Sequence, residues 1–141
     1  MFSGPDFRAY QVARRHRMRD DPHMGVKVLI VDDHAAFRSA ARLLLEEDGF
    51  EVVGEAADGA SALALVRELE PELVLLDVVL PDMSGLEVAE QLVDEPCRIV
   101  LTSSRARSDF GRRLRRSRAL GFVSKDRLSR EAIQALWESA S

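Results

Sequence analysis

Several short apolar segments of the chain end in side chains suited to phosphoryl chemistry. One segment leads into Asp32 and Asp33, and another ends at Asp77. Thr102 ends a third segment, and Lys125 directly follows a fourth. Carboxylates, a hydroxyl and an ammonium are groups that can bind a metal ion, accept a phosphoryl group and neutralise its charge.

The three acids indicate a cation site. Carboxylates held close together repel one another, and a bound divalent cation relieves that repulsion. Hard oxygen ligands, with little His or Cys, favour Mg²⁺ or Mn²⁺ over zinc. Asp77 is the candidate nucleophile and would form an acyl phosphate. Thr102 and Lys125 would stabilise charge on the transferring group.

Each of these residues has an ordinary structural explanation when taken alone. An Asp-Asp pair before a helix commonly caps that helix, and Asp77 could stabilise the turn after it. Thr102 fits a strand, and a lysine after a strand is usually solvated. The specific signal is that all of them occur at strand ends in one chain.

The elements that must position these residues alternate between strands and helices. Nearly continuous apolar runs predict strands covered on both faces, and apolar residues spaced by three and four predict helices. The predicted strands are 27–32, 51–56, 73–77, 98–102 and 121–124. The predicted helices are 36–47, 60–69, 86–93, about 109–119, and a last one capped by Ser129 that ends near 140.

This alternation predicts an α/β fold, a five-stranded parallel sheet with helices on both faces and right-handed crossovers. In the flavodoxin-like strand order 2-1-3-4-5, the first and third strands are neighbours. Ligands of such sheets bind at the carboxyl ends of the strands, where the strand order reverses. Asp32, Asp33 and Asp77 lie at that point.

The composition is that of a globular protein with unevenly distributed charge. The 141 residues are 46% hydrophobic and 31% charged, which argues against a disordered chain. The net charge of −4 divides into +2 over residues 1–25, −13 over 26–97 and +7 over 98–141. This asymmetry predicts two faces with different partners, although the stretches could also neutralise each other within one fold.

Other classes of protein are disfavoured by simple counts. Cys97 is the only cysteine, so the chain forms neither an internal disulfide nor a multi-cysteine zinc site. No apolar run approaches the roughly 18–20 residues of a membrane span, so we expect a cytoplasmic protein with no membrane partner. Residues 1–25 keep no period for long, and we expect a mobile extension before one domain at 26–141.

The ordered motifs resemble the receiver domain of two-component response regulators. The resemblance lies in residues 28–34, 75–85, 100–103 and 121–125, and it covers essentially residues 26–141. It implies that Asp32, Asp33, Asp77 and the backbone carbonyl of Val79 hold Mg²⁺. It also implies that Asp77 accepts a phosphoryl group from a histidine kinase or a phosphotransfer protein.

The resemblance further implies a conformational switch. Thr102 and Phe122 would be the switch pair, and Lys125 the counter-ion of the phosphate. The change would reach the face formed by the fourth and fifth strands and the helices that follow them. Arginines crowd this face and predict a downstream partner with an acidic surface; the alternatives are a solvated helix with no dedicated partner and non-specific contact with nucleic acid. The arginines are Arg105, Arg107, Arg112, Arg113, Arg115, Arg116 and Arg118.

The matching receivers are normally joined to a helix-turn-helix output domain. Only 16 residues follow Lys125, so we expect a stand-alone receiver without sequence-specific DNA binding; the alternative is a fragment of a longer chain. We expect a monomer or a phosphorylation-linked dimer, and the sequence leaves these two open. The resemblance also implies a phosphoacceptor that takes part in its own phosphorylation and dephosphorylation, not an enzyme with a separate substrate.

Three other functions compete with this interpretation. A phosphatase similar to haloacid dehalogenases needs Asp-x-Asp after the first strand, but position 34 is His. A flavin carrier needs a phosphate-binding loop there, where Asp32 and Asp33 would repel the anion. The remaining alternative is a degenerate receiver that acts as a phosphorylation-independent binding module, and the sequence leaves it open.

Overall fold

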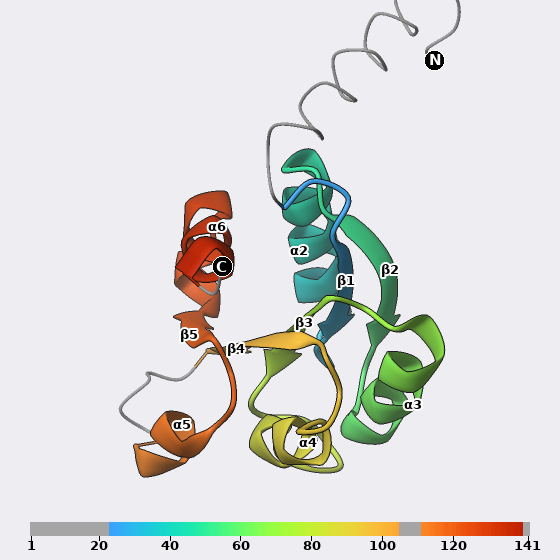
Figure 1. The fold of residues 1–141 in the computed structure, drawn as a ribbon, viewed down its shortest axis with the longest axis vertical. Helices are drawn as coiled ribbons and strands as arrows, with labels where there is room; N and C mark the ends of the chain where they lie inside the picture. Colours follow the sequence, from blue (N-terminus) through green and yellow to red (C-terminus); the bar gives the residue numbers. More distant parts are fainter. Residues whose placement is uncertain (1–22, 105–110, 140–141) are drawn as a thin grey trace, which may run out of the picture.

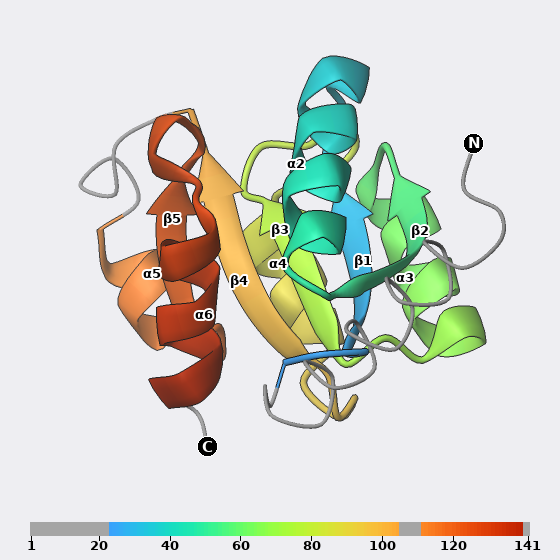
Figure 2. The same ribbon diagram turned by 90° about the horizontal axis from the view of Figure 1, so that it is seen from above.

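A parallel β-sheet forms the centre of the molecule. The computed structural model describes residues 23–104 and 111–139. The strands are β1 (Lys27–Val31), β2 (Glu51–Ala56), β3 (Leu73–Asp77), β4 (Arg98–Ser103) and β5 (Gly121–Ser124). They lie in the order β2-β1-β3-β4-β5, and every adjacent pair is parallel (Figure 2). This arrangement confirms the predicted fold class and strand order.

Helices cover both faces of the sheet (Figure 1). On one face lie α2 (Ala35–Glu47) and α6 (Arg130–Ser139). On the other lie α3 (Gly59–Leu69), α4 (Gly85–Gln91) and α5 (Arg112–Arg116). A short 3-10 turn, η2 (Lys125–Arg127), connects β5 to α6. Among the described residues, no helix combines the length and the apolar character needed to cross a membrane.

The two faces of the sheet bury separate apolar clusters because side chains alternate along each strand. Leu29 and Val31 of β1 belong to the cluster covered by α3 and α4. Val28 and Ile30 belong to the cluster covered by α2 and α6. All four side chains are buried, as the continuous apolar run predicts for a strand with both faces covered.

The basic helix that we predicted over about 109–119 is much shorter. Gly111 precedes α5 with φ 50° and ψ −125°, which is not helical backbone, and Ser117 ends the helix in an extended conformation. Four of its five residues are arginines and none of the five is buried, so repulsion between like charges is not offset by packing. Residues 105–110 lie outside the described part of the chain.

The packed part of the chain begins before the domain boundary that we expected at residue 26. His23 is buried, its ring centroid lies 5.0 Å from that of Phe50, and its Nε2 lies 2.9 Å from the Asp48 carbonyl oxygen. The N–H of Gly25 donates to the Gly49 carbonyl oxygen at 2.9 Å. Residues 23–25 therefore contact the domain. The mobility predicted for residues 1–22 concerns a segment that is not described.

One glycine allows α4 to begin against the end of β3. A Cβ at Gly85 would lie 2.1 Å from the backbone oxygen of Asp77 and 3.0 Å from the Cα of Val78. The Gly85 N–H also donates to the Val78 carbonyl oxygen at 2.7 Å. Because these neighbours are backbone atoms in a close-packed interior, a side chain would fit only if the strand end that carries Asp77 moved.

We predict that Gly85→Ala lowers the free energy of unfolding by about 2–3 kcal/mol, the upper part of the range for overpacking. Gly59→Ala is a matched control because Gly59 is also buried and begins α3, but its Cβ would meet side-chain atoms, of Met83 at 2.5 Å and of Val88 at 3.1 Å, instead of backbone atoms. The control should lose less than about 1 kcal/mol. Urea unfolding measures both, and equal losses would contradict the role assigned to Gly85.

Candidate functional site

The carboxyl ends of β1 and β3 bring two buried carboxylates to one lysine. Asp32 directly follows β1 and Asp77 ends β3, and these residues are 1% and 2% exposed. The two strands are neighbours in the sheet. Lys125 Nζ lies 2.6 Å from Asp32 Oδ2 and 3.0 Å from Asp77 Oδ2. The structure therefore brings together three of the residues that we predicted from the sequence.

Asp33 and His34 extend this group toward solvent. The side chain of Asp33 is 37% exposed and that of His34 is 67% exposed. His34 Nδ1 lies 3.1 Å from Asp32 Oδ1 and 3.1 Å from Asp33 Oδ1. One possible ligand atom from each of Asp32, Asp33, His34 and Asp77 lies within 4.8 Å of the others.

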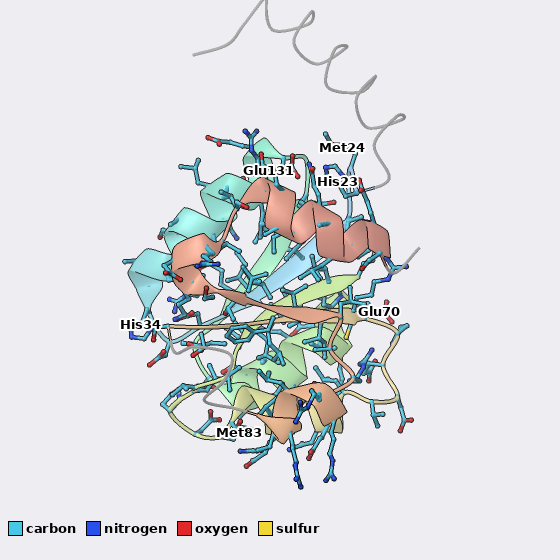
Figure 3. The ribbon with its side chains drawn as sticks, turned by 90° about the vertical axis from the view of Figure 1, so that its left-hand side faces the viewer. His23, Met24, His34, Glu70, Met83 and Glu131 are labelled. Carbon is cyan, nitrogen blue, oxygen red and sulfur yellow. The ribbon has the colours of Figure 1, made fainter. Side chains whose placement is uncertain are left out.

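His34 is a member of this group that we did not assign to it from the sequence. Figure 3 shows it at the outer edge of the molecule, beside the start of α2 (pale cyan). The signal that could have found it is its place directly after the Asp32-Asp33 pair, although adjacency alone does not decide where a side chain points.

The donor set fits a divalent cation. Asp32 Oδ2 is buried and pairs with the Lys125 ammonium at 2.6 Å, and the same ammonium also pairs with Asp77 Oδ2. One ammonium does not balance two buried carboxylates and the neighbouring Asp33, and a divalent cation would compensate the remaining negative charge. Oxygen donors open to solvent on the Asp33 side are the kind of ligand set that Mg²⁺ and Mn²⁺ prefer.

Burial and the ion pairs shift the pKa values of two of these groups. Burial raises the pKa of Asp77, and the Val79 N–H and the Lys125 ammonium oppose that shift. Burial lowers the pKa of Lys125, but the carboxylates of Asp32 and Asp77 together outweigh it, so its pKa is raised overall. The ammonium therefore stays charged and compensates part of the buried negative charge.

Main-chain contacts hold the Asp77 side of the site. The Val79 N–H donates to Asp77 Oδ1 at 3.1 Å. Thr102 is buried, pairs with Asp77 in the register of β3 and β4, and accepts a hydrogen bond from the Val78 N–H on its carbonyl oxygen at 2.9 Å. The expectation that the Val79 carbonyl binds the metal stays a prediction.

Phe122 lies on β5, one strand beyond Thr102, and pairs with Leu101 in the register. Its side chain is only partly buried and packs against the cluster under α3 and α4. With Leu114 and Arg115 of α5, it lines a cavity of about 270 Å³. In this structure Phe122 is therefore not a fully enclosed core residue.

Side chains that we did not predict from the sequence hold the loops around the acids. Arg38 of α2 donates to the Asp32 carbonyl oxygen at 2.7 Å and to Glu55 Oε1 at 3.0 Å. Asp82, in the loop after β3, accepts hydrogen bonds from the first two N–H groups of α3, at 2.7 and 2.9 Å. These bonds lower the pKa of Asp82. The partners lie on different elements, so residue spacing carries no signal for them.

The arginine-rich stretch divides into exposed and anchored residues. The four arginines of α5 are exposed. Arg118 instead donates to the backbone carbonyl oxygens of Leu92 and Cys97, which fastens the segment before β5 to the end of α4. Arg105 and Arg107 belong to the predicted surface but lie outside the described residues.

Comparisons with known proteins agree with this geometry. A sequence model of the response regulator receiver domain matches residues 28–137. The chain is 43% identical over 111 residues to BvgA of Bordetella pertussis, a protein named as a positive transcription regulator of virulence factors, and the alignment covers 77% of this chain and 53% of BvgA. The chain spans about half the length of the curated relatives that it matches.

Solved structures share the fold. The signal receiver domain of the NarL response regulator from Mycobacterium tuberculosis is 35% identical with a TM-score of 0.71, over 83% of this chain and 97% of that one. A CheY-like receiver domain protein from Methanospirillum hungatei is 26% identical with a TM-score of 0.72, over 82% and 93% of the two chains. Because the family match runs from β1 into α6 and includes every strand end described above, the chain belongs to the receiver domains of two-component response regulators.

Proposed function

We propose that this receiver domain is a phosphorylation-dependent signalling switch in which Asp77 is the phosphoacceptor. The observation that carries the proposal is the Lys125 ammonium at 2.6 and 3.0 Å from the buried carboxylates of Asp32 and Asp77. A buried acceptor carboxylate, an adjacent ammonium and acids that fit a cation are what phosphoryl transfer to an aspartate requires. Membership of the receiver family supports the same function.

The donor is the phosphohistidine of a histidine kinase or a phosphotransfer protein. An Asp77 carboxylate oxygen attacks phosphorus, so an O–P bond forms while the P–N bond to the donor imidazole breaks. The imidazole leaves with the electron pair of the broken bond, and the product is an acyl phosphate. The protein thus modifies its own Asp77 and is not an enzyme with a separate substrate.

Positive charge around the transferring group comes from two sources. Asp32, Asp33, Asp77 and the Val79 carbonyl would hold Mg²⁺, or Mn²⁺ in its place, and the bound ion supplies charge that stabilises the phosphoryl oxygens. Lys125 supplies the other charge, because its ammonium already lies 3.0 Å from Asp77 Oδ2. Both compensate the negative charge that collects at the transferring group.

The signal passes from Asp77 to the surface through Thr102 and Phe122. Thr102 is the register partner of Asp77, so its hydroxyl can move toward a phosphoryl oxygen on that residue. Phe122 then turns into the space that Thr102 leaves. An inward phenylalanine buries no polar group. Because Phe122 and residues of α5 line one cavity, this movement alters the face formed by β4, α5, β5 and α6.

The charge of this face indicates what kind of downstream partner binds there. The exposed arginines of α5 support a downstream protein with an acidic surface. We place the protein in the cytoplasm, as a monomer or a phosphorylation-linked dimer. The absence of sequence-specific DNA binding stays a prediction, since BvgA is named as a transcription regulator and is about twice as long as the region that this chain matches.

We predict that acetyl phosphate with Mg²⁺ adds one phosphate to the protein, because Asp77 lies beside both sources of positive charge. Intact-mass spectrometry measures the gain. Asp77→Asn should show none, and Asp82→Asn should retain it, because Asp82 bonds the N-terminus of α3 instead of facing Lys125. A native protein that gains no mass would favour the alternative, a phosphorylation-independent binding module.

Lys125→Ala should lower the rate of phosphorylation roughly 100-fold, the typical effect of removing one group that stabilises transition-state charge. Lys27→Ala is the control, since Lys27 is the other lysine of the chain and is exposed. Circular dichroism verifies that both variants are folded. An unchanged rate in Lys125→Ala would assign the lysine a structural role only.

Asp33→Ala should weaken Mg²⁺ binding roughly tenfold or more, because the variant loses one negative oxygen donor of the site. Asp94→Ala is the control. Asp94 is an exposed acid between α4 and the start of β4, whereas the proposed metal site lies where β1 and β3 end, so this variant should bind Mg²⁺ like the native protein. Calorimetric titration measures both variants. Equal affinity in the two would remove Asp33 from the metal site.

A further inference from the structure

His34 places a nitrogen donor among the oxygen donors of the site. Its Nδ1 lies 3.1 Å from Asp32 Oδ1 and 3.1 Å from Asp33 Oδ1. The imidazole does not cap α2, although His34 occupies the N-cap position and has extended backbone angles. The backbone N–H of His34 donates to Asp32 Oδ1 at 2.8 Å, which holds the residue next to the acid pair. The ring therefore turns back toward the carboxylates instead of serving the helix.

The separations in this group suit ligands of one ion. In an octahedral complex with bonds of about 2.1 Å, adjacent ligand atoms lie about 3.0 Å apart and opposite ones about 4.2 Å apart. The two Nδ1–Oδ1 separations of 3.1 Å match adjacent ligands. All four possible ligand atoms, His34 included, lie within 4.8 Å of one another. The group is therefore compact enough for one cation to contact its members.

A second observation concerns the charge balance of the group. Asp32 is 1% exposed, and its Oδ2 shares the Lys125 ammonium with Asp77 Oδ2, at 2.6 and 3.0 Å, so one ammonium faces two buried carboxylates. The imidazole is 67% exposed, so an ion can reach it from solvent. One end of the group thus carries negative charge that Lys125 balances only in part, and the other offers an accessible nitrogen.

We propose that His34 Nδ1 is a metal ligand that makes this site bind nitrogen-preferring divalent cations, such as Co²⁺, Ni²⁺ and Zn²⁺, in addition to Mg²⁺. Imidazole suits these ions, whereas Mg²⁺ takes oxygen ligands and water. The inference uses the same carboxylates as the proposed phosphoacceptor site. It adds that His34 decides which ions compete with Mg²⁺ there.

A different role for His34 makes a different prediction. If the imidazole were only a hydrogen-bonding partner of Asp32 and Asp33, it would compete with every cation for the same oxygen atoms. Its removal would then change the affinity for all ions by the same factor. A ligand role predicts a loss that depends on the ion, because affinity for an imidazole nitrogen rises from Mn²⁺ through Co²⁺ to Ni²⁺.

The test compares the dissociation constants of Mg²⁺, Mn²⁺, Co²⁺ and Ni²⁺ in the native protein and in His34→Ala by calorimetric titration. We expect the Mg²⁺ affinity to change less than about twofold and the Ni²⁺ affinity to fall roughly tenfold or more, with Mn²⁺ and Co²⁺ between them. His23→Gln removes a different imidazole, which contacts Asp48 and Phe50 beyond the other end of α2, and should leave all four constants unchanged. One common factor for the four ions in His34→Ala overturns the proposal.

A spectroscopic readout identifies the ligand atom. With Zn²⁺ bound, long-range ¹H–¹⁵N correlation spectra should show the His34 Nδ1 resonance shifted to a metal-bound position. This result does not depend on whether Asp77 can be phosphorylated. An unshifted Nδ1 resonance overturns the proposal even if His34→Ala binds ions weakly. If the native protein binds Ni²⁺ through His34 but does not bind Mg²⁺, the result contradicts the proposed phosphoacceptor function and still supports His34 as a metal ligand.

Discussion

The Lys125 ammonium lies between two buried carboxylates, and the chemistry of this domain depends on that contact. Burial of an isolated ion costs on the order of several kcal/mol, so Asp32 and Asp77 need a cation close by to remain charged. A single ammonium compensates one of their two negative charges. The excess negative charge, increased by Asp33, makes the same place suited to a divalent cation.

The parallel sheet makes this contact possible because all its strands end at the same edge. β5 lies two strands from β3 and three from β1, so only a long side chain at the end of β5 reaches both acids. Phe37 of α2 covers that side chain, with its ring centroid 4.7 Å from Lys125 Nζ. Gly85 serves the same contact from the other face, because α4 could not begin against the backbone of Asp77 if it carried a Cβ.

The uneven charge of the chain is only partly neutralised within the fold. Arg38 and Arg42 of α2 both form ion pairs with Glu55 of β2. By contrast, the four arginines of α5 are exposed and form no ion pair with any residue in the described part of the chain. The acidic strand ends and the basic helix are therefore separate features, and Phe122 lines one cavity with Leu114 and Arg115 of the basic helix.

The sequence by itself determined the order of elements and most of the site. The strands predicted at 51–56, 73–77 and 121–124 agree residue for residue with β2, β3 and β5, because apolar runs between turn residues are local signals. Asp32, Asp77 and Lys125 could be placed together because parallel topology collects strand ends. Only the tertiary structure decided the direction of the His34 ring, the Arg38 and Asp82 contacts and the short extent of α5. Those features depend on partners from other elements, whose distances are set by packing and not by spacing along the chain.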